Sequence, residues 1–130
     1  MRAARLRTLS ILAGGAVGAL ARACVAEALP HGAGEWPWAT FGVNVAGTVV
    51  LAWITTRLSE MVAPTRYWRP LIGTGVCGAL TTFSTFQVET ITLVSDGYAG
   101  LALAYASASI AAGMVLAAAA SVIARRRRYG

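Results

Sequence analysis

Long uncharged stretches divide the chain into four apolar segments joined by short polar connections. Three segments contain no charged side chain at all, residues 38–56, 70–88 and 97–124. The first segment, 8–29, carries Arg22 and Glu27 in its second half. A helix needs about 20 residues to cross a bilayer core. The pattern therefore predicts an all-α membrane protein with four transmembrane helices, at about 8–29, 38–57, 69–93 and 98–124.

The composition and the short connections support this prediction. Hydrophobic residues make up 57% of the 130 residues and charged residues 12%, which is a poor composition for a water-soluble domain. The connections at 30–34 and 95–97 are so short that successive helices must be antiparallel neighbours. Trp36 and Trp38, at the start of the second span, are typical of anchors at the membrane interface. We expect residues 1–130 to form a single four-helix transmembrane domain.

The first segment has an alternative interpretation. Arg2, Arg5 and Arg7, the apolar run 9–20 and Ala-Arg-Ala at 21–23 are also typical of a cleavable secretory signal, whose removal would leave three spans. A signal peptide needs no glycine-rich helix face, and this segment has one. We therefore favour a fourth span.

The arginines predict the topology. All eleven basic residues are arginines, against five acids, and ten of them flank the spans. Both termini and the middle connection carry these ten, at Arg2, Arg5, Arg7, Arg57, Arg66, Arg69, Arg125, Arg126, Arg127 and Arg128. By the positive-inside rule both termini are expected on the cytoplasmic side of the membrane, which we expect to be a bacterial plasma membrane. The basic balance is thus a topology signal, and no nucleic-acid partner is expected.

Two polar side chains in the first half of the chain need an explanation at membrane depth. Gly14, Gly18 and Arg22 recur every four residues, which places the arginine on a small-residue packing face. Facing lipid would cost at least about 3 kcal/mol, so the guanidinium points into protein or water, or snorkels to the interface. Asn44 shares a face with Thr40 in the second span, where its amide needs another helix or a passing ligand as partner.

The third span contains the most informative run. Three glycines within 73–78 precede Thr-Thr-Phe-Ser-Thr-Phe at 81–86, which combines poor helix formers with hydroxyl groups. We predict that the third helix is broken near its centre, at an interface or pore that satisfies the freed backbone groups. A straight, hydroxyl-rich helix is the alternative. Phe83 and Phe86 are either ordinary packing residues or rings whose positive edges face a small anion.

Three further positions could extend a polar track. Tyr105, Ser109 and Gly113 recur every four residues and predict a protein-facing stripe on the fourth span. Glu89, near the end of the third span, is either an acid at headgroup level or part of that track. His31 lies in a loop, and no pattern of metal ligands or catalytic residues accompanies it.

The combined motifs resemble the CrcB/Fluc family of fluoride channels over nearly the whole chain. The residues that carry the resemblance are Gly14-Gly15-x-x-Gly18-Ala19-x-x-Arg22, Asn44-x-x-Gly47, and Gly75-x-x-Gly78-x-x-Thr81-Thr82-Phe83-Ser84-Thr85-Phe86. The resemblance implies a passive channel, not an enzyme, that exports cytoplasmic fluoride through pathways at an antiparallel dimer interface in the lipid bilayer. It also implies a structural Na⁺ at the dimer centre, held by the backbone carbonyls of Gly78 and Thr81.

The same resemblance assigns pathway residues. It implies that Phe83 and Phe86 line the path and that Asn44 and Ser109 are hydrogen-bond donors. Thr82, Glu89 and Tyr105 would form an adjoining polar track, and Arg22 would lie near an aqueous vestibule. The family often has a second serine where this chain has Gly113, so one donor of the track is in doubt.

Like Gly113, the charge bias departs from the family pattern, because an antiparallel homodimer inserts most easily when arginine is balanced across the membrane. We hypothesise a fixed orientation and a heterodimer with a related chain of opposite charge bias, with the homodimer as the alternative. Two other functions compete. A small multidrug-type proton-coupled transporter would want an acid in the middle of the first span, and a non-transporting assembly subunit would need no broken helix.

Overall fold

The computed structural model describes residues 2–58 and 65–126, and these are helical throughout apart from short connections. The elements in chain order are α1 (Arg2–Ala28), α2 (Trp38–Leu58), α3 (Thr65–Trp68), the π-helix η1 (Arg69–Cys77), α4 (Gly78–Leu80), α5 (Phe83–Ser95) and α6 (Ala99–Arg126). They make four spans that are long and apolar enough to cross a membrane, Ala3–Ala28, Trp38–Arg57, Arg69–Ser95 and Ala99–Arg126. The prediction of an all-α membrane protein with four spans is confirmed.

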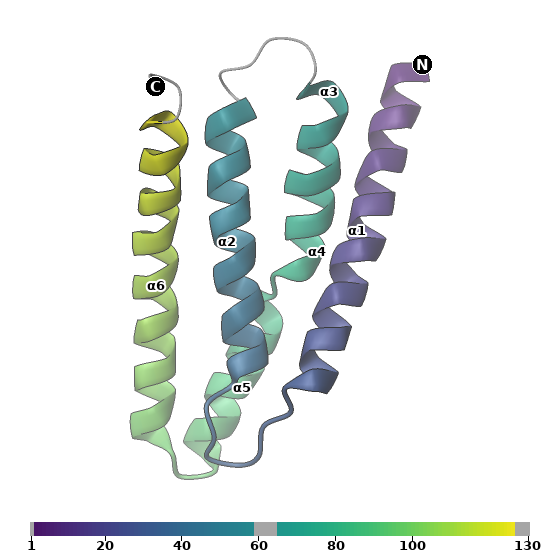
Figure 1. Ribbon diagram of the computed structural model, residues 1–130. Coiled ribbons are helices and arrows are strands. Elements are labelled where there is room, and N and C mark those ends of the chain that lie inside the picture. Colours follow the sequence, from purple (N-terminus) through teal and green to yellow (C-terminus); the bar gives the residue numbers. More distant parts are fainter. Residues whose placement is uncertain (1, 59–64, 127–130) are drawn as a thin grey trace.

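The bundle has two distinct ends (Figure 1). The first turn of α1 and the last turn of α6 lie at one end, which we call the terminal end. The α1–α2 and α5–α6 connections lie at the other, which we call the loop end. Between the ends, α6 packs beside α2, and α1 packs beside η1 and α4.

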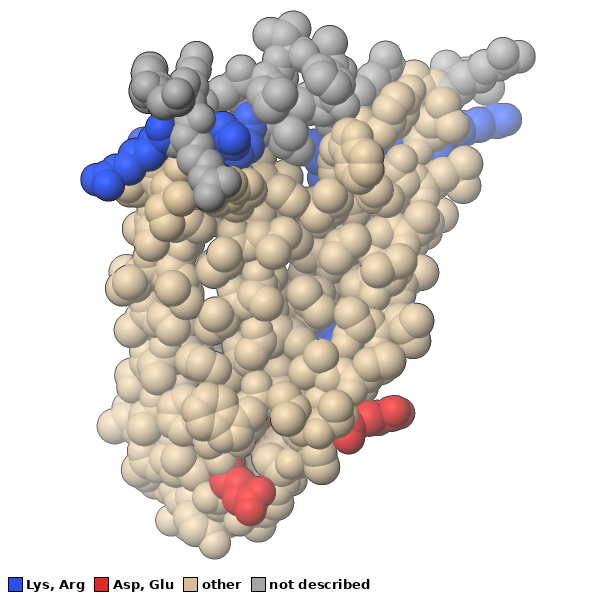
Figure 2. Space-filling view, in the orientation of Figure 1, with Lys and Arg blue, Asp and Glu red and all other residues tan. Residues whose placement is uncertain are grey.

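Charge follows the same division. On the face shown in Figure 2, most of the arginine side chains gather at the terminal end, whereas acidic side chains lie nearer the loop end. The described arginines that flank the spans at the terminal end include Arg5, Arg7, Arg57, Arg125 and Arg126. The arginine asymmetry of the sequence therefore becomes a charge asymmetry along the bundle axis.

Glycines bring the backbones of α1 and η1 into direct contact. A Cβ on Gly14 would overlap the carbonyl oxygen of Leu71, and one on Gly18 would overlap that of Val76. From the other side, a Cβ on Gly75 would lie 2.9 Å from the Cα of Gly14. Dispersion contact between backbones is how helices associate in lipid, where the hydrophobic effect supplies no drive. The glycine face predicted for the first span thus packs against the third.

The first half of the third span is a π-helix, which the sequence pattern did not predict. It runs from Arg69 to Cys77, with Pro70 in its first turn, where a missing N–H costs no helical hydrogen bond. Gly73 and Gly75 lie within it. Such wide turns are rare and are frequently found at functional sites.

The third span breaks at two residues in its centre, which confirms the predicted interruption. Thr81 and Thr82 are extended, with φ/ψ of −77°/152° and −146°/122°. The N–H of Thr81 still donates to the Cys77 carbonyl at 3.1 Å, which closes the last turn before the break. Beyond it, the Thr82 hydroxyl accepts from the N–H of Thr85 at 3.2 Å and caps α5.

The buried core is small and lies toward the loop end. Leu93, Ala102 and Tyr105 form it, and Trp36, Phe41, Phe86 and Leu101 pack against it. Large apolar side chains on all four spans remain exposed, among them Leu12, Val50, Val88 and Leu103. Exposed apolar surface of this extent fits a chain that is surrounded by lipid and contacts other protein.

Candidate functional site

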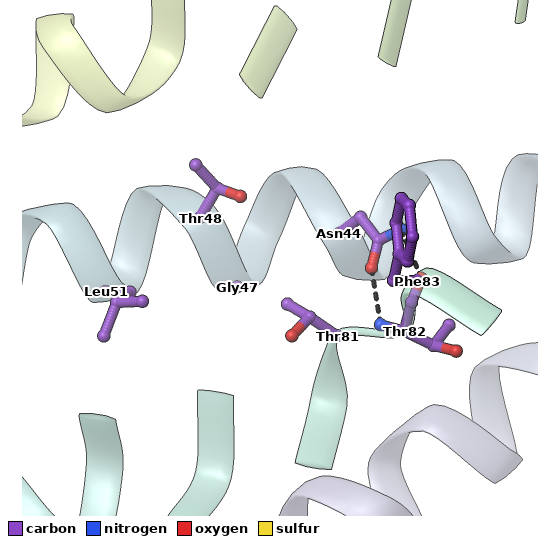
Figure 3. A pocket seen from close by; sticks show the side chains of 7 residues that line it. All are labelled: Asn44, Gly47, Thr48, Leu51, Thr81, Thr82 and Phe83. Atoms are coloured by element: carbon purple, nitrogen blue, oxygen red, sulfur yellow. Dashed lines mark hydrogen bonds between the residues drawn. The ribbon is translucent and has the colours of Figure 1, made fainter. Parts of the chain in front are cut away.

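The break in the third span is pinned by one side chain of α2. The amide of Asn44 donates from Nδ2 to the Thr82 carbonyl at 3.0 Å and accepts at Oδ1 from the Thr82 N–H at 2.8 Å (Figure 3). In a continuous helix that N–H would bond to the carbonyl of Gly78. Asn44 therefore replaces the missing helical partners, as a break at membrane depth requires.

An open cleft of about 280 Å³ lies at this pairing. Its walls come from α2 and from the break, namely Asn44, Gly47, Thr48, Leu51, Thr81, Thr82 and Phe83 (Figure 3). A primary amide carries two N–H donors, and only one is used on Thr82. Gly47 is required for the approach, because a Cβ there would overlap the Thr81 methyl group. The cleft thus combines a remaining amide donor with hydroxyl groups and one aromatic ring.

Hydroxyl groups cluster where α5 begins. Thr82 Oγ1 donates to Thr85 Oγ1 at 2.9 Å and lies 3.4 Å from Ser84 Oγ. A second cleft, of about 210 Å³, contains Thr82 and Thr85 together with Thr40 and Arg22. The half-buried arginine therefore lines the same space as three hydroxyl side chains, on the protein side of α1. Of the two options left by the sequence, a protein-facing guanidinium is the one this geometry supports.

Glu89 joins three elements through a pair of short hydrogen bonds. Thr40 Oγ1 of α2 donates to Glu89 Oε1 at 2.6 Å, and the Tyr105 hydroxyl of α6 donates to Oε2 at 2.8 Å. Both donors are buried, with 5% and 0% of their surface exposed. Each carboxylate oxygen accepts one hydroxyl, so the acid is tied into the protein interior.

Three aromatic rings form a row beside this carboxylate. The centroids of Phe83 and Phe86 are 6.0 Å apart with the rings stacked at 27°, and Phe86 contacts Tyr105 at 5.1 Å. Stacked rings turn their positive edges to the sides, where an anion passing alongside would meet them. Phe83, at the start of the row, is 70% exposed. The row therefore runs from the surface of this chain into its core.

Two buried donors have no hydrogen-bond partner among the described residues, Ser109 Oγ and Trp36 Nε1. Ser109 lies one helical turn from Tyr105 on α6, as the four-residue spacing predicted. Trp36 packs edge-on against Tyr105, with ring centroids 5.5 Å apart at 84°. Sequence reasoning placed Trp36 at the membrane interface and missed its contact with Tyr105, because that contact joins residues far apart in the chain.

The predicted pathway residues lie in one region. Asn44, Thr82 and Phe83 line one cleft, and Arg22 lines a second cleft with Thr82. Ring contacts and a hydrogen bond join Phe83, Phe86, Tyr105 and Glu89 in series, and Ser109 is one helical turn from Tyr105. Gly78 is exposed just before the break, and a Cβ there would meet nothing within 4 Å. Thr81 Oγ1 donates to the Cys77 carbonyl at 2.9 Å.

Fold and site together define a multi-pass membrane protein with a polar track and an aromatic row at a broken helix. Residues 9–121 match the family model described as CrcB-like protein, Camphor Resistance (CrcB). The chain belongs to this family.

Curated relatives cover most of the chain. It is 52% identical over 120 residues to "Fluoride-specific ion channel FluC 1" of Mycobacterium bovis, which is 92% of this chain and 90% of the relative. The protein of the same name from Mycolicibacterium paratuberculosis is 46% identical over 119 residues, again 92% and 90%. That of Streptomyces coelicolor is 40% identical over 113 residues, 87% of this chain and 73% of the relative.

Proposed function

We propose that this protein is a passive, fluoride-selective ion channel that exports cytoplasmic fluoride across the bacterial plasma membrane. The names of its relatives support this proposal, and one observation carries it physically. A buried Ser109 hydroxyl with no partner among the described residues lies one helical turn from Tyr105, at the inner end of the Phe83–Phe86–Tyr105 row. Fluoride is small and strongly hydrated, so a path must offer closely spaced donors to replace water. Neutral hydroxyls, an amide and ring edges do so without a full charge that would trap the ion.

The conducting unit is an antiparallel dimer. The cleft at Asn44 is open on one side, and Phe83 is largely exposed in a single chain, although both carry the chemistry of the path. A second subunit would cover this face and complete the wall of the pathway. Because the cell interior is electrically negative, the anion flows outward.

The partner subunit is a related chain of opposite charge bias. Cations gather at the terminal end of this bundle, so an inverted identical copy would place them all on the outer side, against the positive-inside rule. Labelling of cysteines introduced at both termini, in intact cells, tests the fixed orientation. Labelling from outside the cell at either terminus would contradict it and favour the homodimer.

A structural Na⁺ lies at the centre of the dimer. Backbone carbonyl oxygens suit a hard cation, and the Gly78 carbonyl lacks its helical partner because the Thr82 N–H donates to Asn44. The carbonyls of Gly78 and Thr81 and the equivalent carbonyls of the partner subunit would hold the ion. We expect fluoride efflux to fall when Na⁺ is replaced by a large organic cation throughout purification, and an unchanged rate would contradict this site.

Fluoride efflux from proteoliposomes decides between the channel and its rivals. Liposomes loaded with potassium fluoride and containing the protein assembled with its partner subunit should release fluoride when valinomycin supplies a potassium current, and chloride-loaded liposomes should not release chloride. A proton-coupled drug transporter or an assembly subunit would give no fluoride release. No release from correctly assembled protein would therefore overturn the proposal.

A further inference from the structure

Trp36 carries a buried hydrogen-bond donor that the pathway described so far does not use. Its indole Nε1 is covered by protein but has no partner among the described residues. A buried donor left without an acceptor costs about 1–3 kcal/mol. Indole N–H can only donate, so the group that satisfies it is an acceptor other than the described residues.

The surroundings of Trp36 continue the aromatic row. Its ring meets Tyr105 edge to face at 5.5 Å, and Tyr105 in turn contacts Phe86 at 5.1 Å. The Tyr105 hydroxyl is already committed to Glu89. A chain of touching rings thus runs from Phe83 through Phe86 and Tyr105 to Trp36. The Trp36 ring also contacts the ring of the exposed Trp38 at 5.8 Å.

The two unpartnered donors lie on opposite sides of Tyr105 along the bundle. Ser109 follows Tyr105 by one turn on α6, toward the terminal end. Trp36 lies two residues before the start of α2, in the α1–α2 connection, which is at the loop end of the bundle. Tyr105 lies between them and contacts the Trp36 ring. Donors without acceptors therefore stand both before and after the Glu89–Tyr105 pair.

The chain holds Trp36 rigidly. Its carbonyl accepts from the N–H of Trp38 at 2.8 Å, and the next residue, Pro37, is almost completely buried. Phe41 packs edge-on against the indole at 5.7 Å and 78°. A donor held in this way loses little conformational entropy when it binds an ion, which is the condition for a preorganised ligand.

From these contacts we propose that the indole N–H of Trp36 is a fluoride ligand at the loop end of the pathway. The inference rests on the proposed fluoride conduction and extends it by one site. The donor is neutral, so it replaces part of the hydration shell of the ion without retaining it.

The test removes the N–H and keeps the ring. Trp36 is replaced during synthesis by benzothienylalanine, in which sulfur stands where the indole N–H was, and in a second variant by phenylalanine. We expect fluoride efflux from proteoliposomes to fall about tenfold in both, the typical effect of one lost hydrogen bond. Trp38→Phe is the matched control, because Trp38 is an exposed indole two residues away, and we expect it to conduct as the unmodified protein does.

If Trp36 binds fluoride, the melting temperature of the benzothienylalanine protein should equal or exceed that of the unmodified protein, since an unpartnered buried donor has been removed. A merely structural role predicts a fall in melting temperature instead. Efflux at the unmodified rate would overturn the inference, and so would a loss of efflux that follows a fall in melting temperature. Absence of fluoride efflux from the unmodified protein would instead overturn the proposed function itself.

Discussion

The side chain of Asn44 on α2 forms two hydrogen bonds with the backbone of Thr82, at 3.0 Å to its carbonyl and 2.8 Å from its N–H. One amide therefore satisfies both polar groups of the residue at the centre of the broken span. The pairing explains how a helix can be interrupted at membrane depth and still leave a donor facing the adjoining cleft.

Replacing Asn44 with leucine should destabilise the protein strongly. Both backbone groups of Thr82 would be left unpaired, at about 1–3 kcal/mol each. We expect a clear fall in the melting temperature of the purified protein and loss of fluoride efflux. Thr48→Val is the control, because Thr48 lines the same cleft without bonding to Thr82. An Asn44→Leu protein with unchanged melting temperature would show that the pairing does not hold the break.

Glycines on one helix should differ sharply in their tolerance of alanine. A Cβ on Gly14 or Gly18 would overlap a carbonyl oxygen of η1, whereas a Cβ on Gly15 would meet nothing within 4 Å. We expect Gly18→Ala to separate α1 from η1 and to lower the free energy of unfolding by about 1–3 kcal/mol or more, the usual effect of overpacking. Gly15→Ala should be neutral or slightly stabilising, since alanine favours helix by about 1 kcal/mol over glycine.

Unfolding of both alanine variants in a denaturing detergent series measures this difference. Equal stability of Gly15→Ala and Gly18→Ala would mean that the close contact between α1 and η1 contributes nothing.

Tyr105→Phe separates the hydroxyl of this residue from its ring. The ring contacts to Phe86 and Trp36 remain, but Glu89 loses one of its two hydroxyl donors. We expect a loss of about 1–3 kcal/mol in stability and a reduced rate of fluoride efflux, because the carboxylate is left with a free acceptor beside the path. Tyr98→Phe, at a more exposed tyrosine, should change neither quantity. Fluoride efflux through Tyr105→Phe at the wild-type rate would contradict a role for this hydroxyl in the polar track.

Phe83→Ile and Phe86→Ile should each abolish fluoride efflux while leaving the fold intact. Isoleucine keeps apolar bulk but has no ring edge of positive potential to face an anion. Efflux from proteoliposomes is the measurement, and retention of the dimer on gel filtration shows that assembly is preserved. Val88→Ile, an exposed position on the same helix, serves as the control. Rapid efflux through either isoleucine variant would contradict a role for the rings in conduction.

The local pattern of the chain was sufficient for the four spans and for the interruption of the third. Within lipid, every backbone group of a span must bond inside its own segment, so a span is helical. A continuous apolar run in the sequence is therefore enough to locate it. The Thr-Thr-Phe-Ser-Thr-Phe run after spaced glycines marks a weak point in a helix for the same local reason. The glycine face of the first span was also predictable, since lipid offers no other means of close packing.

Other features follow only from residues that lie far apart in the chain. The pairing of Asn44 with Thr82, the two hydroxyls on Glu89 and the edge-on contact of Trp36 with Tyr105 join different helices. Their geometry depends on how the helices cross, and no periodicity within one helix encodes that. The π-helix of the third span is likewise outside a pattern read at helical spacing. Local hydropathy and propensity thus decided where the chain spans and breaks, while packing between spans decided which polar groups are paired and which have no partner among the described residues.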